Sequence, residues 1–183
     1  MKNEHEIMAR DTASYLPVFS RYPIVLDHGE GSYVWDVNGR KYLDALGGIA
    51  VNVLGHNYAP LVDAIAEQAK RLIHVSNLYY TEPQADAAAK LSALTAGGKV
   101  FFGNSGAEAN EGAIKAARKY GHTIHPEKSQ IITALGSFHG RTLATLTATG
   151  QEKFHKGFAP LPQGFDYVPY NDISALEALM SEN

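Results

Sequence analysis

The stretch FFGNSGAEANEGAIKAARKY, residues 101–120, passes from an apolar pair through a Gly/Asn/Ser turn into a strongly helical sequence. A helix that begins in such a turn presents backbone N–H groups without partners and the positive end of its dipole, and the Ser105 hydroxyl adds a further donor. The turn therefore predicts a phosphate-binding site. An ordinary helix N-cap formed by Ser105 or Asn104 is the alternative, and both interpretations stay open on this turn alone.

Strands and helices alternate on both sides of this stretch. Short buried strands are predicted at residues 100–102, 131–135 and 165–170. Helices are predicted at residues 60–73, 81–94, 107–120 and from Asp172 onward, with the third of them ending before Gly121. This order predicts an α/β fold in which helices cover a mostly parallel sheet and ligands bind in the loops after the strands' carboxyl ends.

The N-terminal part of the chain has a different pattern. Residues 24–43 alternate apolar and polar side chains around the pair Asn38-Gly39, which is typical of a tight hairpin turn, so a β-meander is predicted. The glycine-rich residues 43–60 have no clear period and predict a buried loop with close backbone approach. The change in composition predicts a division between a β-rich segment over 1–55 and an α/β part over 56–183.

A second turn, GSFHGRT at residues 136–142, follows the strand predicted at 131–135. Phe138 could stack on a planar ring, and Arg141 could bind a carboxylate through two parallel hydrogen bonds. The alternatives are a core phenylalanine and a surface ion pair. Both residues are predicted at the sheet edge that carries the first turn, which favours a binding site.

Composition and charge exclude several classes of protein. The formal net charge is −3, and no run of Lys or Arg could track a nucleic acid. The chain has no cysteine, which excludes disulfides and thiolate metal sites. No window approaches the length of a membrane span, so a cytoplasmic protein is expected. The eight histidines lack carboxylates at ligand spacing, and no metal site is predicted; His139 is expected to orient its loop by hydrogen bonds.

Three separated motifs resemble the class III pyridoxal-phosphate (PLP) aminotransferases. They are residues 29–56, the run FFGNSGAEANEGAIKAARKYGH and the segment that begins SFHGRTLATLTATG. Within that class the sequence most resembles the acetylornithine and succinylornithine aminotransferases. The resemblance implies the fold of the fold-type I PLP-dependent transferases, which is aspartate aminotransferase-like, and a homodimer. In that fold, residues 1–55 would be part of the small domain, and residues 56–183 would be the first part of a truncated, PLP-binding large domain.

The resemblance also implies site roles. Ser105, Gly106 and Ala107 would hold the phosphate of pyridoxal 5'-phosphate, and Phe138 would stack on its ring. Arg141 would bind the α-carboxylate of the substrate, and Tyr15 would lie near the substrate entrance. The lysine that binds the cofactor covalently and the acidic partner of the pyridine nitrogen belong to the family's second half, so no catalytic residue is assigned and this chain alone is expected to be an inactive fragment.

The activity that the resemblance implies is transfer of the terminal amino group of N-acetylornithine, or of succinylornithine, to 2-oxoglutarate in arginine biosynthesis. An ornithine or 4-aminobutyrate aminotransferase is an alternative, because Arg141 would suit many carboxylated substrates. A different alternative is a truncated, non-catalytic paralogue that pairs with full-length subunits. Whether the chain is a fragment or a truncated paralogue, a sheet cut midway would expose an edge strand and an apolar face.

Overall fold

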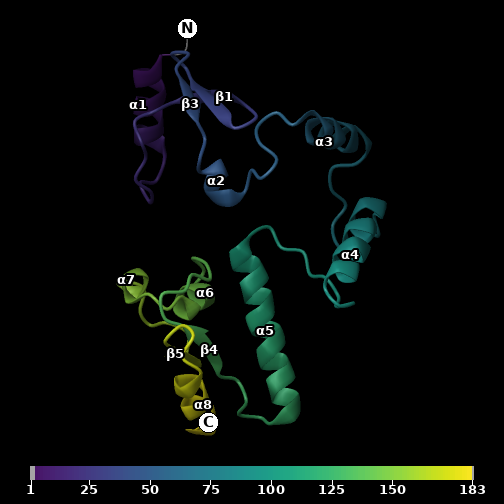
Figure 1. Cartoon of the computed structure of the whole chain (residues 1–183), viewed down its shortest axis with the longest axis vertical. Coiled ribbons are helices and arrows are strands. Elements are labelled where there is room, and N and C mark those ends of the chain that lie inside the picture. Colours follow the sequence, from purple (N-terminus) through teal and green to yellow (C-terminus); the bar gives the residue numbers. More distant parts are fainter. Residues whose placement is uncertain (1–2, 183) are drawn as a thin grey trace. The chain divides into compact units, whose positions relative to one another are not determined.

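The computed structural model describes residues 3–182 and divides into two units, Met1–Tyr80 and Thr81–Asn183. Each unit is described by itself (Figure 1). Composition predicts a division near residue 55, where the β-rich sequence gives way to helices. That this division is a domain boundary stays a prediction.

The first unit is built around an antiparallel meander. Helix α1 (Glu4–Ser14) precedes β1 (Leu26–Glu30), β2 (Tyr33–Asp36) and β3 (Lys41–Leu43), which pair in the order β1-β2-β3. Gly39 takes the left-handed conformation, with φ +81°, in the β2–β3 turn. The meander and its Asn38-Gly39 turn are thus confirmed.

Asp36 fixes this turn from its buried position at the end of β2. Its carboxylate accepts hydrogen bonds from the N–H groups of Asn38 and Arg40, both at 2.9 Å, and from the Tyr42 hydroxyl at 2.8 Å. Burial alone would raise the pKa of Asp36, but these three donors outweigh it and hold the pKa below its ordinary value. The turn is therefore held by a side chain as well as by its glycine.

Residues 43–60 form an exposed loop rather than the buried one predicted. It contains the short α2 (Gly47–Ala50), where φ is positive at every residue, and the Ile49 side chain is 86% exposed. The prediction was wrong because apolar composition was taken for burial, whereas no described element packs over these side chains. The close backbone approach is confirmed, since a Cβ on Gly55 would lie 2.9 Å from the Gly31 carbonyl oxygen.

A carboxylate–imidazole pair anchors the start of this loop to its end. His56 Nε2 lies 2.8 Å from Asp44 Oδ2, and the N–H groups of Leu46 and Gly47 donate to Asp44 Oδ1 at 3.1 and 2.9 Å. The His56 contact, followed by the Gly47 N–H, holds the pKa of Asp44 below its ordinary value of 3.8. A depressed pKa in the folded state means that Asp44 stabilises the fold above its ordinary pKa and ceases to do so as the pH falls through the folded value.

We expect the urea midpoint of the first unit to fall as the pH is lowered from about 5 to about 3, and Asp44→Asn to remove part of that fall. The fluorescence of Trp35, the single tryptophan, reports the transition. Asp63→Asn is the matched control, because Asp63 is exposed. Equal acid sensitivity in Asp44→Asn and the unsubstituted protein would contradict the assignment.

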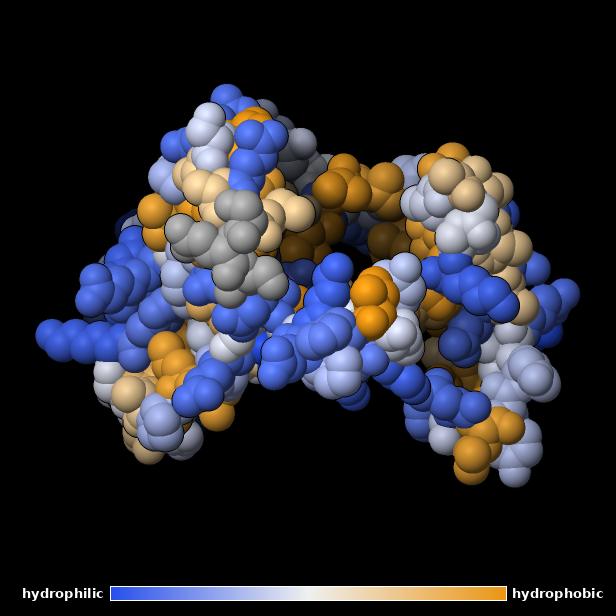
Figure 2. All heavy atoms as spheres, turned by 90° about the horizontal axis from the view of Figure 1, so that it is seen from below, coloured by the Kyte–Doolittle hydropathy of each residue, from blue (hydrophilic) through white to orange (hydrophobic). Residues whose placement is uncertain are grey.

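Helix α3 (Ala59–Arg71) completes the first unit. Pro60 lies in its first turn, as the sequence predicts, whereas the helix ends at Arg71, two residues before the predicted end, with Lys70 and Arg71 in its last turn. Its apolar residues are largely exposed, as are those of the segment that follows it, and Figure 2 shows apolar side chains on the surface among charged ones. The apolar face expected of a sheet cut midway is a different surface, and its exposure stays a prediction.

The second unit begins with α4 (Glu82–Leu94), which has Thr81 at its N-cap position, and continues with the long α5 (Gly106–Ile124). The strand predicted at 100–102 is absent: these residues are irregular, and Phe101 is 69% exposed. A strand requires a hydrogen-bonded partner, and no described segment pairs with it.

Helix α5 also passes through Gly121, where it was predicted to stop, and ends at Ile124. A Cβ on Gly121 would collide with the Lys128 carbonyl oxygen. The lack of a side chain at Gly121 therefore lets the following loop pack closely against α5, and the glycine does not end the helix.

The remaining elements form the core of the second unit. Strands β4 (Ile131–Ala134) and β5 (Phe165–Val168) pair in parallel, as predicted. Between them lie α6 (Leu143–Ala148) and α7 (Glu152–His155), and α8 (Ile173–Glu182) follows with its Ala175 N–H bonded to the predicted cap, Asp172, at 2.9 Å. Residues 145–149 of α6 and its C-cap are buried, and Figure 1 shows α5 running beside α6.

Candidate functional site

The N-terminus of α5 combines a helix cap with free donors. Ser105 is the N-cap, and its Oγ accepts a hydrogen bond from the Glu108 N–H at 3.2 Å; the Glu108 carboxylate in turn accepts from the Asn104 N–H at 2.5 Å. The capping interpretation is thus confirmed for Ser105. It leaves the hydroxyl proton of Ser105 available, because the cap uses only the oxygen as an acceptor.

The first two N–H groups of the helix, those of Gly106 and Ala107, have no hydrogen-bond partner within residues 3–182. Apart from its chain neighbours and the backbone of its own helix, no described atom lies within 4 Å of the position that a Cβ on Gly106 would take. An anion could therefore approach the backbone closely at this point, where the helix dipole favours negative charge.

Loop 136–142 is fixed by hydrogen bonds to the end of α6. The His139 N–H donates to Thr149 Oγ1 at 2.9 Å, and the Gln151 side chain donates to the Ser137 carbonyl at 2.9 Å. The backbone N–H of His139 therefore helps to orient the loop, but the hydrogen bonds expected of the histidine side chain are not observed within residues 3–182. Its imidazole does not contribute, since the buried Nε2 has no hydrogen-bond partner in the described chain.

The structure brings the two turns together through residues of α5. Asn110 Nδ2 donates to the His139 carbonyl at 2.7 Å, and the Thr142 hydroxyl donates to the Glu111 carboxylate. Gly140 completes the contact: a Cβ there would lie 2.8 Å from the Ala107 Cβ, so the loop touches the first turn of the helix through a glycine. The predicted phosphate site and the loop of Phe138 and Arg141 are thus neighbours.

Phe138 and Arg141 lie side by side in this loop. The Arg141 guanidinium carbon lies 5.5 Å from the centre of the Phe138 ring and 4.4 Å from that of Phe154 on α7. Phe138 is 57% exposed, so it is not a core phenylalanine, and Arg141 forms no ion pair with any described residue. Neither structural alternative is formed within residues 3–182, and the binding roles of both residues stay predictions.

Four residues of this arrangement were missed by the sequence analysis: Asn110, Glu111, Thr142 and Phe154. A signal existed for the first two, because residues three and four positions after Ala107 share its side of the helix. Tyr15 belongs to the first unit, where the Arg21 guanidinium lies over its ring at 4.2 Å, and its role at the substrate entrance stays a prediction.

The residues present fit a phosphate-bearing aromatic group. The unpartnered N–H groups and the Ser105 hydroxyl suit a phosphate, and the exposed Phe138 offers a face to a planar ring. No cluster of metal-ligating side chains occurs among the described residues, and none of the described helices could cross a membrane.

Comparisons with known proteins give the family of this chain. Residues 16–183 match the family described as Aminotransferase class-III. The chain is 60% identical over 162 residues to the acetylornithine aminotransferase of Caldanaerobacter subterraneus, covering 88% of this chain and 41% of that protein. It is 51% identical over 174 residues to the acetylornithine aminotransferase of Methanothermobacter thermautotrophicus, covering 95% and 43%. The chain thus spans about two fifths of the length of these curated relatives.

Solved structures of aminotransferases are also similar to this chain. The ornithine aminotransferase of Toxoplasma gondii matches the whole chain and 44% of its own length, with a TM-score of 0.92 and 28% identity. A second structure of that enzyme is described as having partial occupancy of PLP at the active site, and matches with a TM-score of 0.93. The acetylornithine aminotransferase of Elizabethkingia anophelis matches with a TM-score of 0.78 and 32% identity over 100% of this chain and 42% of its own.

The family match, the identities and the common fold lead to one conclusion. This chain belongs to the class III aminotransferases.

Proposed function

We propose that residues 1–183 form the N-terminal part of a PLP-dependent aminotransferase that moves the terminal amino group of N-acetylornithine, or of succinylornithine, to 2-oxoglutarate. The 60% identity to an acetylornithine aminotransferase is the observation that carries the choice of substrate. The approach of loop 136–142 to the start of α5 supports the chemistry, since it gathers donors for a phosphate, a ring face and an unpaired cation.

Each part of the site has a separate task. The N–H groups of Gly106 and Ala107 and the Ser105 hydroxyl hold the cofactor phosphate, and the helix dipole stabilises its charge. Phe138 supports the ring, and Arg141 binds a substrate carboxylate. The cofactor, when bound, supplies an electron-withdrawing ring that allows the bond between the amino group and the substrate carbon to be exchanged.

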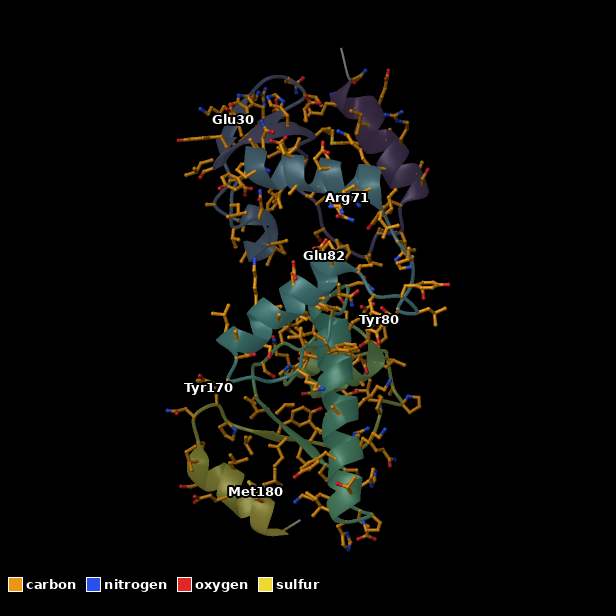
Figure 3. The ribbon with its side chains drawn as sticks, turned by 90° about the vertical axis from the view of Figure 1, so that its right-hand side faces the viewer. Glu30, Arg71, Tyr80, Glu82, Tyr170 and Met180 are labelled. Atoms are coloured by element: carbon orange, nitrogen blue, oxygen red, sulfur yellow. The ribbon has the colours of Figure 1, made fainter. Side chains whose placement is uncertain are left out.

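A homodimer is part of the proposal. Leu78, Tyr79 and Tyr80 are all exposed, and Tyr80, labelled in Figure 3, is fully so. Such a run of large apolar side chains suits a protein interface. An ornithine aminotransferase is the second candidate, favoured by the TM-scores of 0.92 and 0.93 with the Toxoplasma gondii enzyme.

A hybrid enzyme tests the proposal. Residues 1–183 are joined to the part of the Caldanaerobacter subterraneus relative that lies beyond the matched region, and transamination of 2-oxoglutarate is measured with N-acetylornithine, ornithine and 4-aminobutyrate. We expect N-acetylornithine to be the preferred donor. Preference for ornithine would favour the second candidate. An inactive hybrid beside an active parent would contradict the proposal and favour a non-catalytic chain.

Ser105→Ala is expected to weaken binding of the cofactor to the hybrid by about tenfold or more, because a hydrogen bond to a charged group contributes about 1.5–3 kcal/mol. The loss of the cap lowers stability by about 1 kcal/mol as well. Titration of the apoenzyme with PLP, followed by absorbance, measures the first effect, and urea unfolding measures the second. Ser105→Thr retains the hydroxyl and is the control.

Reduced stability with unchanged cofactor affinity in Ser105→Ala would show that Ser105 is only a helix cap. This outcome is informative because the structure demonstrates the cap itself, through the Glu108 N–H. The two measurements therefore separate the interpretations that the sequence left open.

A further inference from the structure

Arg141 is a cation without a hydrogen-bond acceptor. Within residues 3–182 no carboxylate or carbonyl accepts its N–H groups. Its guanidinium instead makes cation–π contacts with the rings of Phe138 and Phe154. The second stacked arginine of the unit differs in this respect. Arg118 lies 4.9 Å from the centre of the Phe165 ring, and its side chain also donates to the carbonyls of Ser129, Gln163 and Gly164 at 2.7–3.2 Å.

The ring of Phe154 is held in place independently of Arg141. The next residue, His155, places its Nε2 2.9 Å from the Leu146 carbonyl and 2.8 Å from the Thr149 carbonyl, which fixes α7 to the end of α6. Phe154 also meets Phe138 edge to face, with ring centres 6.3 Å apart and an interplanar angle of 76°. The two rings form a supported surface beneath the guanidinium.

An aromatic support differs chemically from an ionic one. A carboxylate beside Arg141 would occupy its N–H donors and neutralise its charge. The face of a phenyl ring attracts the cation through its quadrupole and leaves the N–H donors without an acceptor. Such an arginine is restrained in position and remains able to bind a carboxylate through two parallel hydrogen bonds.

We propose that Phe154 is a positioning residue for the substrate carboxylate: its ring restrains the Arg141 guanidinium in the orientation that receives the carboxylate. The inference rests on the proposed function, because it takes Arg141 as the carboxylate ligand. It adds a specificity element from α7 to the site formed by α5 and loop 136–142.

The test uses the hybrid enzyme with its cofactor bound. Phe154→Leu removes the ring and retains an apolar side chain, whereas Phe154→Tyr retains the ring face. We expect Phe154→Leu to raise the Kd of 2-oxoglutarate, measured by calorimetry, by about three- to tenfold, which is the range of a partly exposed cation–π contact. The KM for 2-oxoglutarate rises with it while kcat and cofactor affinity stay unchanged, and Phe154→Tyr restores both values.

Two comparisons distinguish positioning from a general effect on the fold. Phe165→Leu removes the ring under the fully bonded Arg118 and should lower stability without changing the Kd of 2-oxoglutarate. In an Arg141→Ala background, Phe154→Leu should have no further effect on that Kd, since the group it positions is gone.

An unchanged Kd in Phe154→Leu, or an equal rise with and without Arg141, would overturn the inference while the proposed function stands. A hybrid that neither binds 2-oxoglutarate nor transaminates would overturn both. The calorimetric measurement keeps these cases apart because it reports carboxylate binding without turnover.

Discussion

Arg141→Ala is expected to lower kcat/KM for 2-oxoglutarate in the hybrid enzyme by about thirtyfold to a few thousandfold. Removing one partner of a charge-assisted hydrogen-bonded pair costs about 2–5 kcal/mol, and each 1.4 kcal/mol is about a factor of ten. Steady-state kinetics with N-acetylornithine as the donor measures the effect. Stability should fall by only about 1 kcal/mol, because Arg141 forms no hydrogen bond or ion pair with the rest of the described chain and loses only its cation–π contacts with Phe138 and Phe154.

Arg141→Lys is the matched control, since it keeps the positive charge and loses the planar pair of donors. We expect an intermediate loss of kcat/KM, with most of the change in KM. If Arg141→Ala left the KM for every carboxylated substrate unchanged, Arg141 would not be the carboxylate ligand. The rings of Phe138 and Phe154 would then support a purely structural cation.

The sequence predicted the two turns because each carries a local chemical signal. Ser105 and its glycine neighbours predict a helix N-terminus with free donors, and Phe138 with Arg141 predicts a loop that offers a ring and a cation. Their proximity followed from the rule that loops after parallel strands share one sheet edge. In the structure the two turns are close for a different reason. The predicted strand at 100–102 does not form, and α5 itself holds loop 136–142 through Asn110.

Other features could not be predicted from the sequence because they depend on contacts between distant residues. Phe154 looks like an ordinary apolar residue of a short helix, and only the fold places its ring 4.4 Å from Arg141. Gly121 has the composition signal of a helix end, yet it meets the backbone at Lys128 and the helix continues. Burial of Ile49 was inferred from its apolar neighbours, whereas burial requires a second surface to pack against.

Gly140→Ala is expected to destabilise the second unit by about 2–4 kcal/mol and to weaken cofactor binding at the same time. Gly140 has φ +139°, and a Cβ there would lie 2.5 Å from Thr145 Oγ1 and 2.8 Å from the Ala107 Cβ. Thr145 is fully buried and cannot move without disturbing α6, so the strain is transmitted to Ala107 in the predicted phosphate site. Urea unfolding followed by circular dichroism and titration of the hybrid apoenzyme with PLP measure the two effects.

Gly136→Ala separates contact from backbone strain in the same loop. Gly136 also has a positive φ, +77°, but no described atom beyond its chain neighbours lies within 4 Å of the Cβ position. We therefore expect only the conformational cost of about 1–2 kcal/mol, with cofactor affinity preserved. If both alanine variants had the same effect on PLP binding, the contact between Gly140 and Ala107 would not transmit the change. A selective loss in Gly140→Ala would instead show that the close approach of the loop to the first turn of α5 maintains the phosphate site.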